Sequence, residues 1–182
     1  MNYKYNDTTQ LTEHFNVQEF HCECGGTHDI IINHELVDKL EQLFKALDCS
    51  KIIVTSGYRC ASCDKAVGGS GAGQHVNGNA ADIVCYDRAG NKISSKIVCC
   101  AAQDIGFRGI ANIDDTYTAT HVDVRPAGTW LGDEVVTTAY SVTDNFYTYY
   151  KIDKNAAKST VNTKSSKDQL LEELKALYEK YS

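Results

Sequence analysis

The spacing of hydrophobic residues predicts two well-formed helices in the first 134 positions. Over residues 33–48, Asn33 is a suitable N-cap, and apolar residues recur every three or four positions as one stripe: Leu36, Val37, Leu40, Leu43, Phe44 and Leu47. A second helix is expected over residues 94–106, where a glycine ends the apolar run. Shorter helices are expected within residues 11–26 and at the start of residues 60–74.

Between these helices lie short runs with the character of strands, at residues 51–56, 80–86, 109–113 and 120–125. The first run, KIIVTS, is β-branched and is expected to be buried. In the last run, alternation places His121, Asp123 and Arg125 on one face of the strand. We therefore predict an α+β fold in which helices pack on one side of a small, mainly antiparallel sheet.

The character of the chain changes after Glu134, which predicts a domain at residues 1–134 and a C-terminal extension at residues 135–182. Within the extension we expect one or two strands up to residue 152 and then a polar linker. The chain ends in an expected amphipathic helix whose apolar side carries Leu170, Leu171, Leu174, Leu177 and Tyr178. Such a helix most often docks on its own domain, so we expect a monomer.

Composition narrows the class of protein. The chain is 42% hydrophobic and 23% charged, with a mean hydropathy of −0.36. Its net charge of −6 argues against a nucleic-acid surface. No apolar run approaches the ~20 residues of a membrane span. The opening ten residues lack the apolar core of a secretory signal, so we expect the chain to be made in the cytoplasm and to reach any external target by another route.

One polar stretch carries candidate metal ligands. In GQHVNGNAADI, His75 and Asp82 stand seven positions apart, which in a helix would separate them by ~10 Å along the axis. Two zinc ligands need donor atoms only a few Å apart, so a helix is excluded if both bind one ion. A hairpin turning at residues 78–79 would place them opposite each other, whereas a turn at residues 77–78 would not. His121 is the candidate third ligand, and hydrogen-bonded surface residues are the alternative.

Cysteine is abundant, with eight residues in the chain. Two close pairs could supply four thiolates to a structural zinc, namely Cys22 with Cys24 and Cys60 with Cys63. Disulfides between these elements are a second interpretation. Reduced, buried thiols are the third, because cysteines also lie in apolar stretches, at Cys85, Cys99 and Cys100. The pattern alone does not choose among them, and a second zinc is not the favoured reading.

Four segments together resemble a known family. TSGYRC, AVGGSGAGQH, HVNGNAADI and HVDVR occur in the order found in zinc D-alanyl-D-alanine carboxypeptidases and L-alanyl-D-glutamate endopeptidases, which share their fold with the hedgehog signalling domain. The similarity runs from about Leu11 to Glu134. It implies a hedgehog/DD-peptidase-like fold and one catalytic zinc held by His75, Asp82 and His121.

The resemblance also implies roles for other residues. Arg59 matches an arginine that supports catalysis or binds the substrate's carbonyl or carboxylate. The family's serine is replaced by glycine at position 73, and Gln74 is the neighbouring candidate for substrate binding. Thr118 stands where many relatives carry their catalytic carboxylate. The general base is therefore expected to be Asp123 or Asp115, and Asp123 could instead orient a ligand histidine.

These expectations define a function and its alternative. The resemblance implies a zinc metallopeptidase that cleaves peptidoglycan stem-peptide bonds involving D-amino acids. A phage endolysin, made in the bacterial cytoplasm and acting at the wall after release, fits this description. The alternative is a non-catalytic, zinc-stabilised module that binds cell wall or belongs to a phage particle. Neither reading involves nucleic acid or membrane partners.

Overall fold

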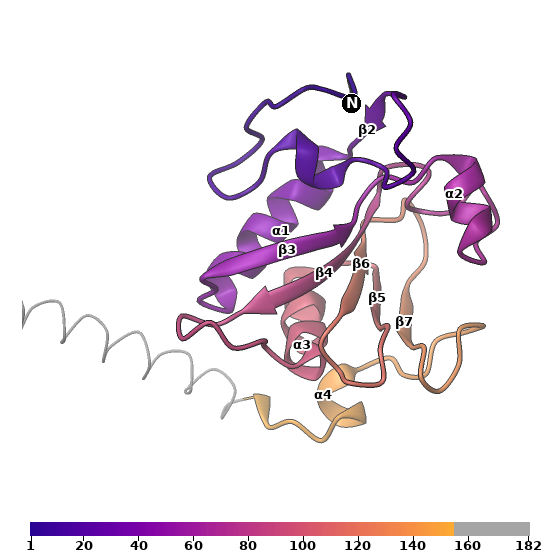
Figure 1. Cartoon of the computed structure of the whole chain (residues 1–182). Coiled ribbons are helices and arrows are strands. Elements are labelled where there is room, and N and C mark those ends of the chain that lie inside the picture. The colour runs from indigo at the N-terminus through magenta and orange to yellow at the C-terminus, as the bar shows by residue number, and fades with distance from the viewer. Residues whose placement is uncertain (155–182) are drawn as a thin grey trace, which may run out of the picture.

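The central sheet has five strands in the order β3-β4-β6-β5-β7 (Figure 1). The computed structural model describes residues 1–154. The strands are β3 Lys51–Ser56, β4 Ala80–Tyr86, β5 Gly109–Asn112, β6 Thr120–Asp123 and β7 Trp130–Asp133. All neighbours run antiparallel except β5 and β7, which are parallel. The predicted α+β fold with a mainly antiparallel sheet is thus confirmed.

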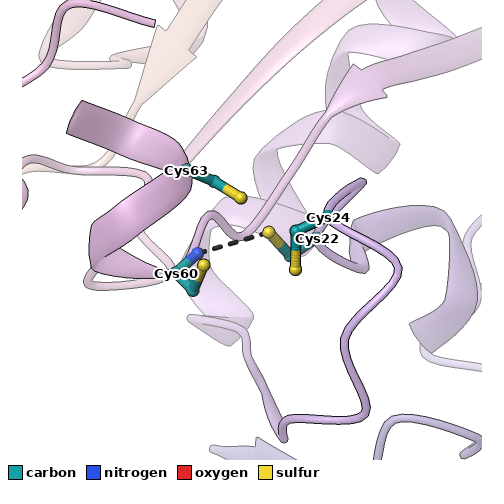
Figure 2. A group of neighbouring side chains, drawn as sticks. All are labelled: Cys22, Cys24, Cys60 and Cys63. Carbon is teal, nitrogen blue, oxygen red and sulfur yellow. Dashed lines mark hydrogen bonds between the residues drawn. The ribbon is translucent and has the colours of Figure 1, made fainter. Parts of the chain in front are cut away.

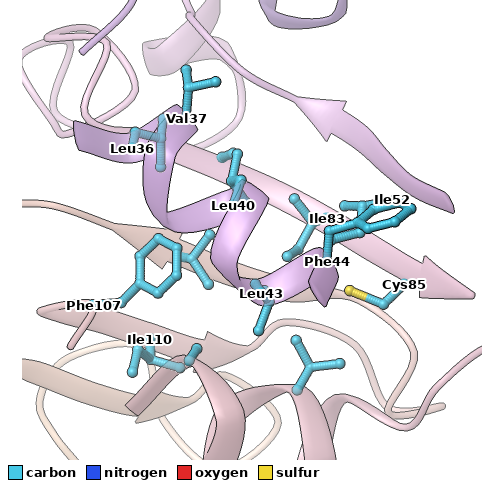
Figure 3. Close-up of a cluster of buried hydrophobic side chains, with 14 of the residues drawn as sticks. Leu36, Val37, Leu40, Leu43, Phe44, Ile52, Ile83, Cys85, Phe107 and Ile110 are labelled. Atoms are coloured by element: carbon cyan, nitrogen blue, oxygen red, sulfur yellow. The ribbon is translucent and has the colours of Figure 1, made fainter. Parts of the chain in front are cut away.

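Two helices, α1 (His34–Ala46) and α3 (Ser95–Ile105), pack on one face of this sheet (Figure 1). The Asn33 side chain caps α1 by accepting a hydrogen bond from the backbone N–H of Glu35. The apolar stripe of α1 is buried, and Figure 3 shows its leucines directed toward Ile83 on β4 and Ile110 on β5. Because this stripe makes one core with the sheet, the opposite face of the sheet is left for polar side chains.

The remaining elements are short. A two-stranded antiparallel pair joins β1 (Asn2–Tyr3) to β2 (Ile30–Ile31). Three brief helices complete the described chain, namely η1 Val17–Phe20, α2 Ala61–Ala66 and α4 Phe146–Tyr149. The predicted helices within residues 11–26 and 60–74 correspond to η1 and α2. No helix in residues 1–154 is both long and apolar enough to span a membrane.

Residues 51–56 form a strand as predicted, but the prediction that this strand is buried is wrong. Strand β3 lies at the edge of the sheet, and its exposure alternates along its length. Ile52 points into the core, whereas Ile53 is 39% exposed. The helices cover only one face of the sheet, so alternate side chains of this strand point away from the core.

The prediction of strands in residues 135–152 is also wrong. Apart from one isolated bridge between Asp133 and Thr137, this region forms turns and the helix α4. Phe146 in this region is fully buried, and the Phe146 and Tyr150 rings stack on each other, whereas Tyr140 is 67% exposed. The Asn145 side chain starts α4 by accepting a hydrogen bond from Thr148 N. Most of the predicted polar linker and all of the predicted terminal helix lie outside the described residues.

Candidate metal centre

Three predicted ligands meet on the sheet face opposite α1 and α3. Asp82 on β4 and His121 on β6 are direct partners across the two strands, and His75 approaches from the turn before β4. His121 Nδ1 lies 2.9 Å from Asp82 Oδ1 and 3.2 Å from His75 Nε2, and the third side of this triangle is 3.3 Å. Donors bound to one tetrahedral zinc at 2.0–2.1 Å stand about 3.3 Å apart. The three atoms therefore fit one face of a zinc tetrahedron.

The hairpin expected at residues 73–83 is not formed. Residues 73–79 coil into a turn in which the N–H groups of Asn77, Gly78 and Asn79 donate to the carbonyls three to five residues earlier. Asp82 consequently pairs with His121 and not with His75. The turn still brings His75 to Asp82, because it folds back over the end of β4. The two ligands are close for a reason different from the predicted one.

In each histidine, the ring nitrogen that points away from Asp82 is held by a hydrogen bond to an oxygen atom. His75 Nδ1 lies 2.7 Å from the Gly57 carbonyl oxygen, and His121 Nε2 lies 3.2 Å from Asp123 Oδ2. With an ion bound, each of these nitrogens would donate to its oxygen, and His75 Nε2 and His121 Nδ1 would be free to bind the ion together with Asp82. Such hydrogen bonds to the remote nitrogen are typical of zinc-bound histidines.

The electrostatics favour a cation where the donors meet. The three candidate ligands are each no more than 9% exposed. Burial alone would raise the pKa of Asp82, but hydrogen bonds from His121 and His75 hold it well below its usual range. Burial would likewise lower the pKa of His121, yet Asp123 and Asp82 raise it to about 9. A negative potential strong enough to shift a buried imidazole this way also attracts a divalent ion.

Asp123 is fully buried and fully paired. Its carboxylate accepts from Arg125 Nε at 2.9 Å and Arg125 Nη2 at 2.5 Å, besides contacting His121. Although burial opposes ionisation, Arg125 and His121 keep its pKa well below its usual range. The carboxylate packs against Gly109 of β5, where a Cβ atom would come 1.9 Å from Asp123 Oδ2. A strongly acidic, enclosed carboxylate is a poor general base, and this geometry suits the orienting role.

Replacing Asp123 by asparagine is expected to weaken zinc binding about 10- to 100-fold, because the charged acceptor that fixes the His121 ring becomes a neutral amide, which accepts more weakly. The affinity can be measured by competition with a chromogenic chelator. Asp144→Asn, a change at an exposed loop carboxylate, is the control and should leave the affinity unchanged. Unaltered zinc affinity in the Asp123→Asn protein would contradict this role.

Arg59 contacts the ligand set directly. One guanidinium nitrogen, Nη2, donates to Asp82 Oδ2, and Nε donates to Ser56 Oγ at 2.7 Å. Nη1 lies 3.9 Å from the buried carboxylate of Asp64. The Arg59 side chain is 21% exposed, so part of the guanidinium faces the solvent beside the centre. Arg59 thus holds the second oxygen of Asp82 in place and presents a positive edge to an incoming oxygen atom.

Gly73 and Gln74 form no hydrogen bond with the side chains of the three ligands. Gln74 Oε1 accepts a hydrogen bond from the Asn79 side chain, which ties it into the turn. A Cβ atom at Gly73 would meet only the Asp64 carboxylate, at ordinary van der Waals distance, so a serine would fit there. Substrate binding by Gln74 stays a prediction.

Asp115 and Glu134 differ in their relation to the centre. Both residues are exposed, and Asp115 lies in the loop between β5 and β6. Glu134 continues β7 by donating its N–H to Asn112 O, and it lies two residues beyond Gly132, which is level with His121 across the sheet. Alternation therefore places Glu134 on the face of His121. The sequence offered no motif for Glu134, since its place depends on the parallel pairing of β7 with β5.

Electrostatic coupling supports this placement of Glu134. Although Glu134 is an exposed residue, partial desolvation of its carboxyl group raises the pKa above the usual value, and the charges of His121, Asp82, Arg59 and His75 all act on it. In the described part of the chain, its carboxylate makes no hydrogen bond or ion pair. Trp130 stands on the same strand face, with its ring edge-to-face with His121 at 5.7 Å. Glu134 is therefore an uncommitted carboxylate beside the candidate metal centre.

Comparison with protein families agrees with this geometry. Residues 13–123 match the family described as Peptidase M15, over more than half of the chain and including all three candidate ligands. A comparison with curated proteins gave no match. The segments that carry the resemblance, from SGYR to HVDVR, lie within this match except for the last two residues of HVDVR. The chain belongs to the M15 peptidases, a family of zinc-dependent metallopeptidases.

Proposed function

We propose that this protein is a zinc peptidase that hydrolyses stem-peptide amide bonds of peptidoglycan in which D-amino acids take part. The main support is the triangle of His75 Nε2, Asp82 Oδ1 and His121 Nδ1, with each imidazole held by a hydrogen bond on its far nitrogen. Three protein ligands are the usual complement of a catalytic zinc, which keeps a further position for water or substrate.

The chain's own groups suit amide hydrolysis. When bound, zinc would polarise the scissile carbonyl and acidify an attacking water. Glu134, with its raised pKa, would take the proton of that water and pass it to the leaving amine. Arg59 would hold Asp82 and stabilise the negative charge that develops on the carbonyl oxygen. Trp130, beside His121, would provide an apolar wall for the substrate.

The finer parts of the proposal come from the resemblance. Phage endolysins of this family act on stem peptides at the cell wall, and we propose the same role, with synthesis in the bacterial cytoplasm and action after release. The two arginines near the centre, Arg59 and Arg125, suit a substrate that carries carboxylates. The acting form is proposed to be a monomer.

Removing metal is expected to abolish the activity reversibly. Purified protein incubated with peptidoglycan sacculi should release peptide fragments whose masses identify the bond that is cut. Treatment with a chelator should reduce this release to background, and added zinc should restore it, because the water is acidified only by the ion. Release that continues after the metal has been removed would contradict the proposal.

The same experiment separates the enzyme from a non-catalytic wall-binding module. A module would bind zinc and sediment with sacculi but release no fragments. The unpaired carboxylate of Glu134 beside the candidate centre favours the enzyme, because a structural zinc has no use for a proton acceptor.

A further inference from the structure

A second group of metal-binding side chains lies away from the candidate centre. Cys22 and Cys24 follow η1, and Cys60 and Cys63 belong to the start of α2. In Figure 2 the four side chains extend toward one another from these two segments. All four sulfur atoms lie within 4.8 Å of one another. Thiolates bound to one tetrahedral zinc at about 2.3 Å stand about 3.8 Å apart, so a small contraction would close the group around an ion.

Two of the sulfur atoms also accept hydrogen bonds from nearby donors. The backbone N–H of Cys60 donates to Cys22 Sγ at 3.4 Å, the dashed line in Figure 2. The backbone N–H of Gly26 donates to Cys24 Sγ, also at 3.4 Å, and His28 Nε2 lies 2.9 Å from the same sulfur. Hydrogen bonds of this kind stabilise the thiolate form, which is the form that binds zinc.

The other four cysteines behave differently. Cys49, Cys85, Cys99 and Cys100 are all buried in the hydrophobic core, where cysteine acts as a small apolar side chain. The four clustered cysteines instead range from buried Cys22 to exposed Cys24. None of the eight forms a disulfide. The core cysteines agree with the predicted buried thiols, and the cluster needs a separate account.

The cluster joins two segments that already run together. Tyr58 N donates to Phe20 O at 2.9 Å, and a Cβ atom at Gly57 would come 2.6 Å from Phe20 Cα. Gly57 provides the carbonyl that orients His75, and Arg59 precedes the first cysteine of the second pair. A link across the four cysteines would therefore hold the backbone that positions two groups of the candidate centre.

We infer that Cys22, Cys24, Cys60 and Cys63 bind a second zinc ion, whose role is to fasten the segment 57–63 to the segment 20–24. The inference needs no catalytic activity and stands apart from the proposed function. Four thiolates with short spacing within each pair are typical of structural zinc sites, which have no open position.

Metal analysis of the full chain, purified under reducing conditions, tests the inference. The wild type should contain about two zinc ions per chain, a His75→Ala/His121→Ala protein about one, and a Cys24→Ser/Cys63→Ser protein about one. Cobalt in place of zinc should give thiolate-to-cobalt charge-transfer absorption in the histidine variant but not in the cysteine variant. Cys100→Ala, which changes a core cysteine, should keep both ions. A wild type with a single zinc that depends on His75 and His121 would overturn the inference.

Two further measurements do not depend on the folding of the serine variant. In the His75→Ala/His121→Ala protein, p-hydroxymercuribenzoate should release the remaining zinc, because it captures thiolates. Cys24→His should retain the second ion, since zinc accepts three thiolates and an imidazole. Intact mass of the reduced preparation showing disulfides among these four cysteines would overturn the inference.

Stability and activity report on the structural role. Loss of the second zinc should lower the melting temperature by about 10 °C or more. If the proposed function holds, peptidoglycan turnover should also fall although the zinc at His75, Asp82 and His121 remains. Should the protein prove to have no peptidase activity, the zinc counts and the melting temperature still decide the inference. An unchanged melting temperature in a protein that has lost the thiolate-bound zinc would overturn the fastening role.

Discussion

Changing His121 to alanine is expected to lower peptidoglycan turnover about a thousandfold or more. The imidazole supplies one of three donors, and the two that remain would hold zinc too weakly to keep the centre filled. Since a catalytic metal ion contributes several kcal/mol to the transition state, each ~1.4 kcal/mol lost reduces the rate tenfold. Turnover of sacculi and zinc content should be measured on the same preparation.

The control for this change is His34→Ala. His34 begins α1 and contacts the hydroxyl group of Tyr3, and it is not one of the three ligands. Its loss should leave turnover and zinc content close to those of the wild type. A His121→Ala protein that has lost its zinc but digests sacculi at the normal rate would exclude the metal from the reaction.

Changing Glu134 to glutamine is expected to lower turnover about 100- to 10,000-fold while zinc content stays unchanged. Glutamine keeps the shape of the side chain but cannot accept the proton of the attacking water. Partial burial raises the pKa of the Glu134 carboxyl group above its usual value, and only the ionised form can act as a base. Wild-type turnover should therefore rise with pH through this raised pKa, and the residual turnover of the variant should lack that rise.

Asp115→Asn is the comparison that decides between the two carboxylates. Asp115 and Glu134 are both exposed, but only Glu134 is placed on the face of His121 by the strand pairing, so replacing Asp115 should change turnover by less than about twofold. If Asp115→Asn removed activity and Glu134→Gln did not, Asp115 in the β5–β6 loop would be the group that accepts the proton of the attacking water. In that case the placement of Glu134 on the face of His121 would have no catalytic meaning.

Local signals in the sequence accounted for most of the elements. The stripe from Leu36 to Leu47 and the Asn33 cap predicted α1, and both act within one helix. The runs that became β4 and β6 were also recognisable, because apolar and β-branched residues are concentrated in them. Residues 135–152 failed this test: their aromatic and β-branched residues resemble a strand, yet Phe146 gains more by entering the core beside α3.

The geometry of the candidate centre was only partly accessible in advance. Residue types and family resemblance indicated His75, Asp82 and His121, but strand order was needed to know that Asp82 faces His121. The shape of the 73–79 turn depends on a distant contact, since Asn33 N donates to the carbonyl of Gly78. Such a contact between segments far apart in the chain leaves no periodic trace in the sequence.

Two groups near the centre could be predicted to different extents. Arg125 lies two positions from Asp123 on the strand face predicted for both, so its contact with Asp123 is a local one. Glu134 stands at the expected domain boundary, where no motif indicates a functional residue. Its relation to His121 passes through two strand pairings, β6 with β5 and β5 with β7. Residue types indicate which side chains could bind metal or transfer protons, whereas the order of the strands is needed to know which of these side chains lie close together.

The glycine beneath Asp123 has a consequence for how this chain can diverge. A single added carbon at Gly109 would collide with the carboxylate that orients His121. The two positions are therefore expected to covary: a descendant that keeps the aspartate must keep the glycine, and one that loses the aspartate is free to replace both. Among more distant homologues, a glycine at the position paired with Asp123 is therefore expected wherever the aspartate that orients His121 is kept, although the glycine itself takes no part in the chemistry.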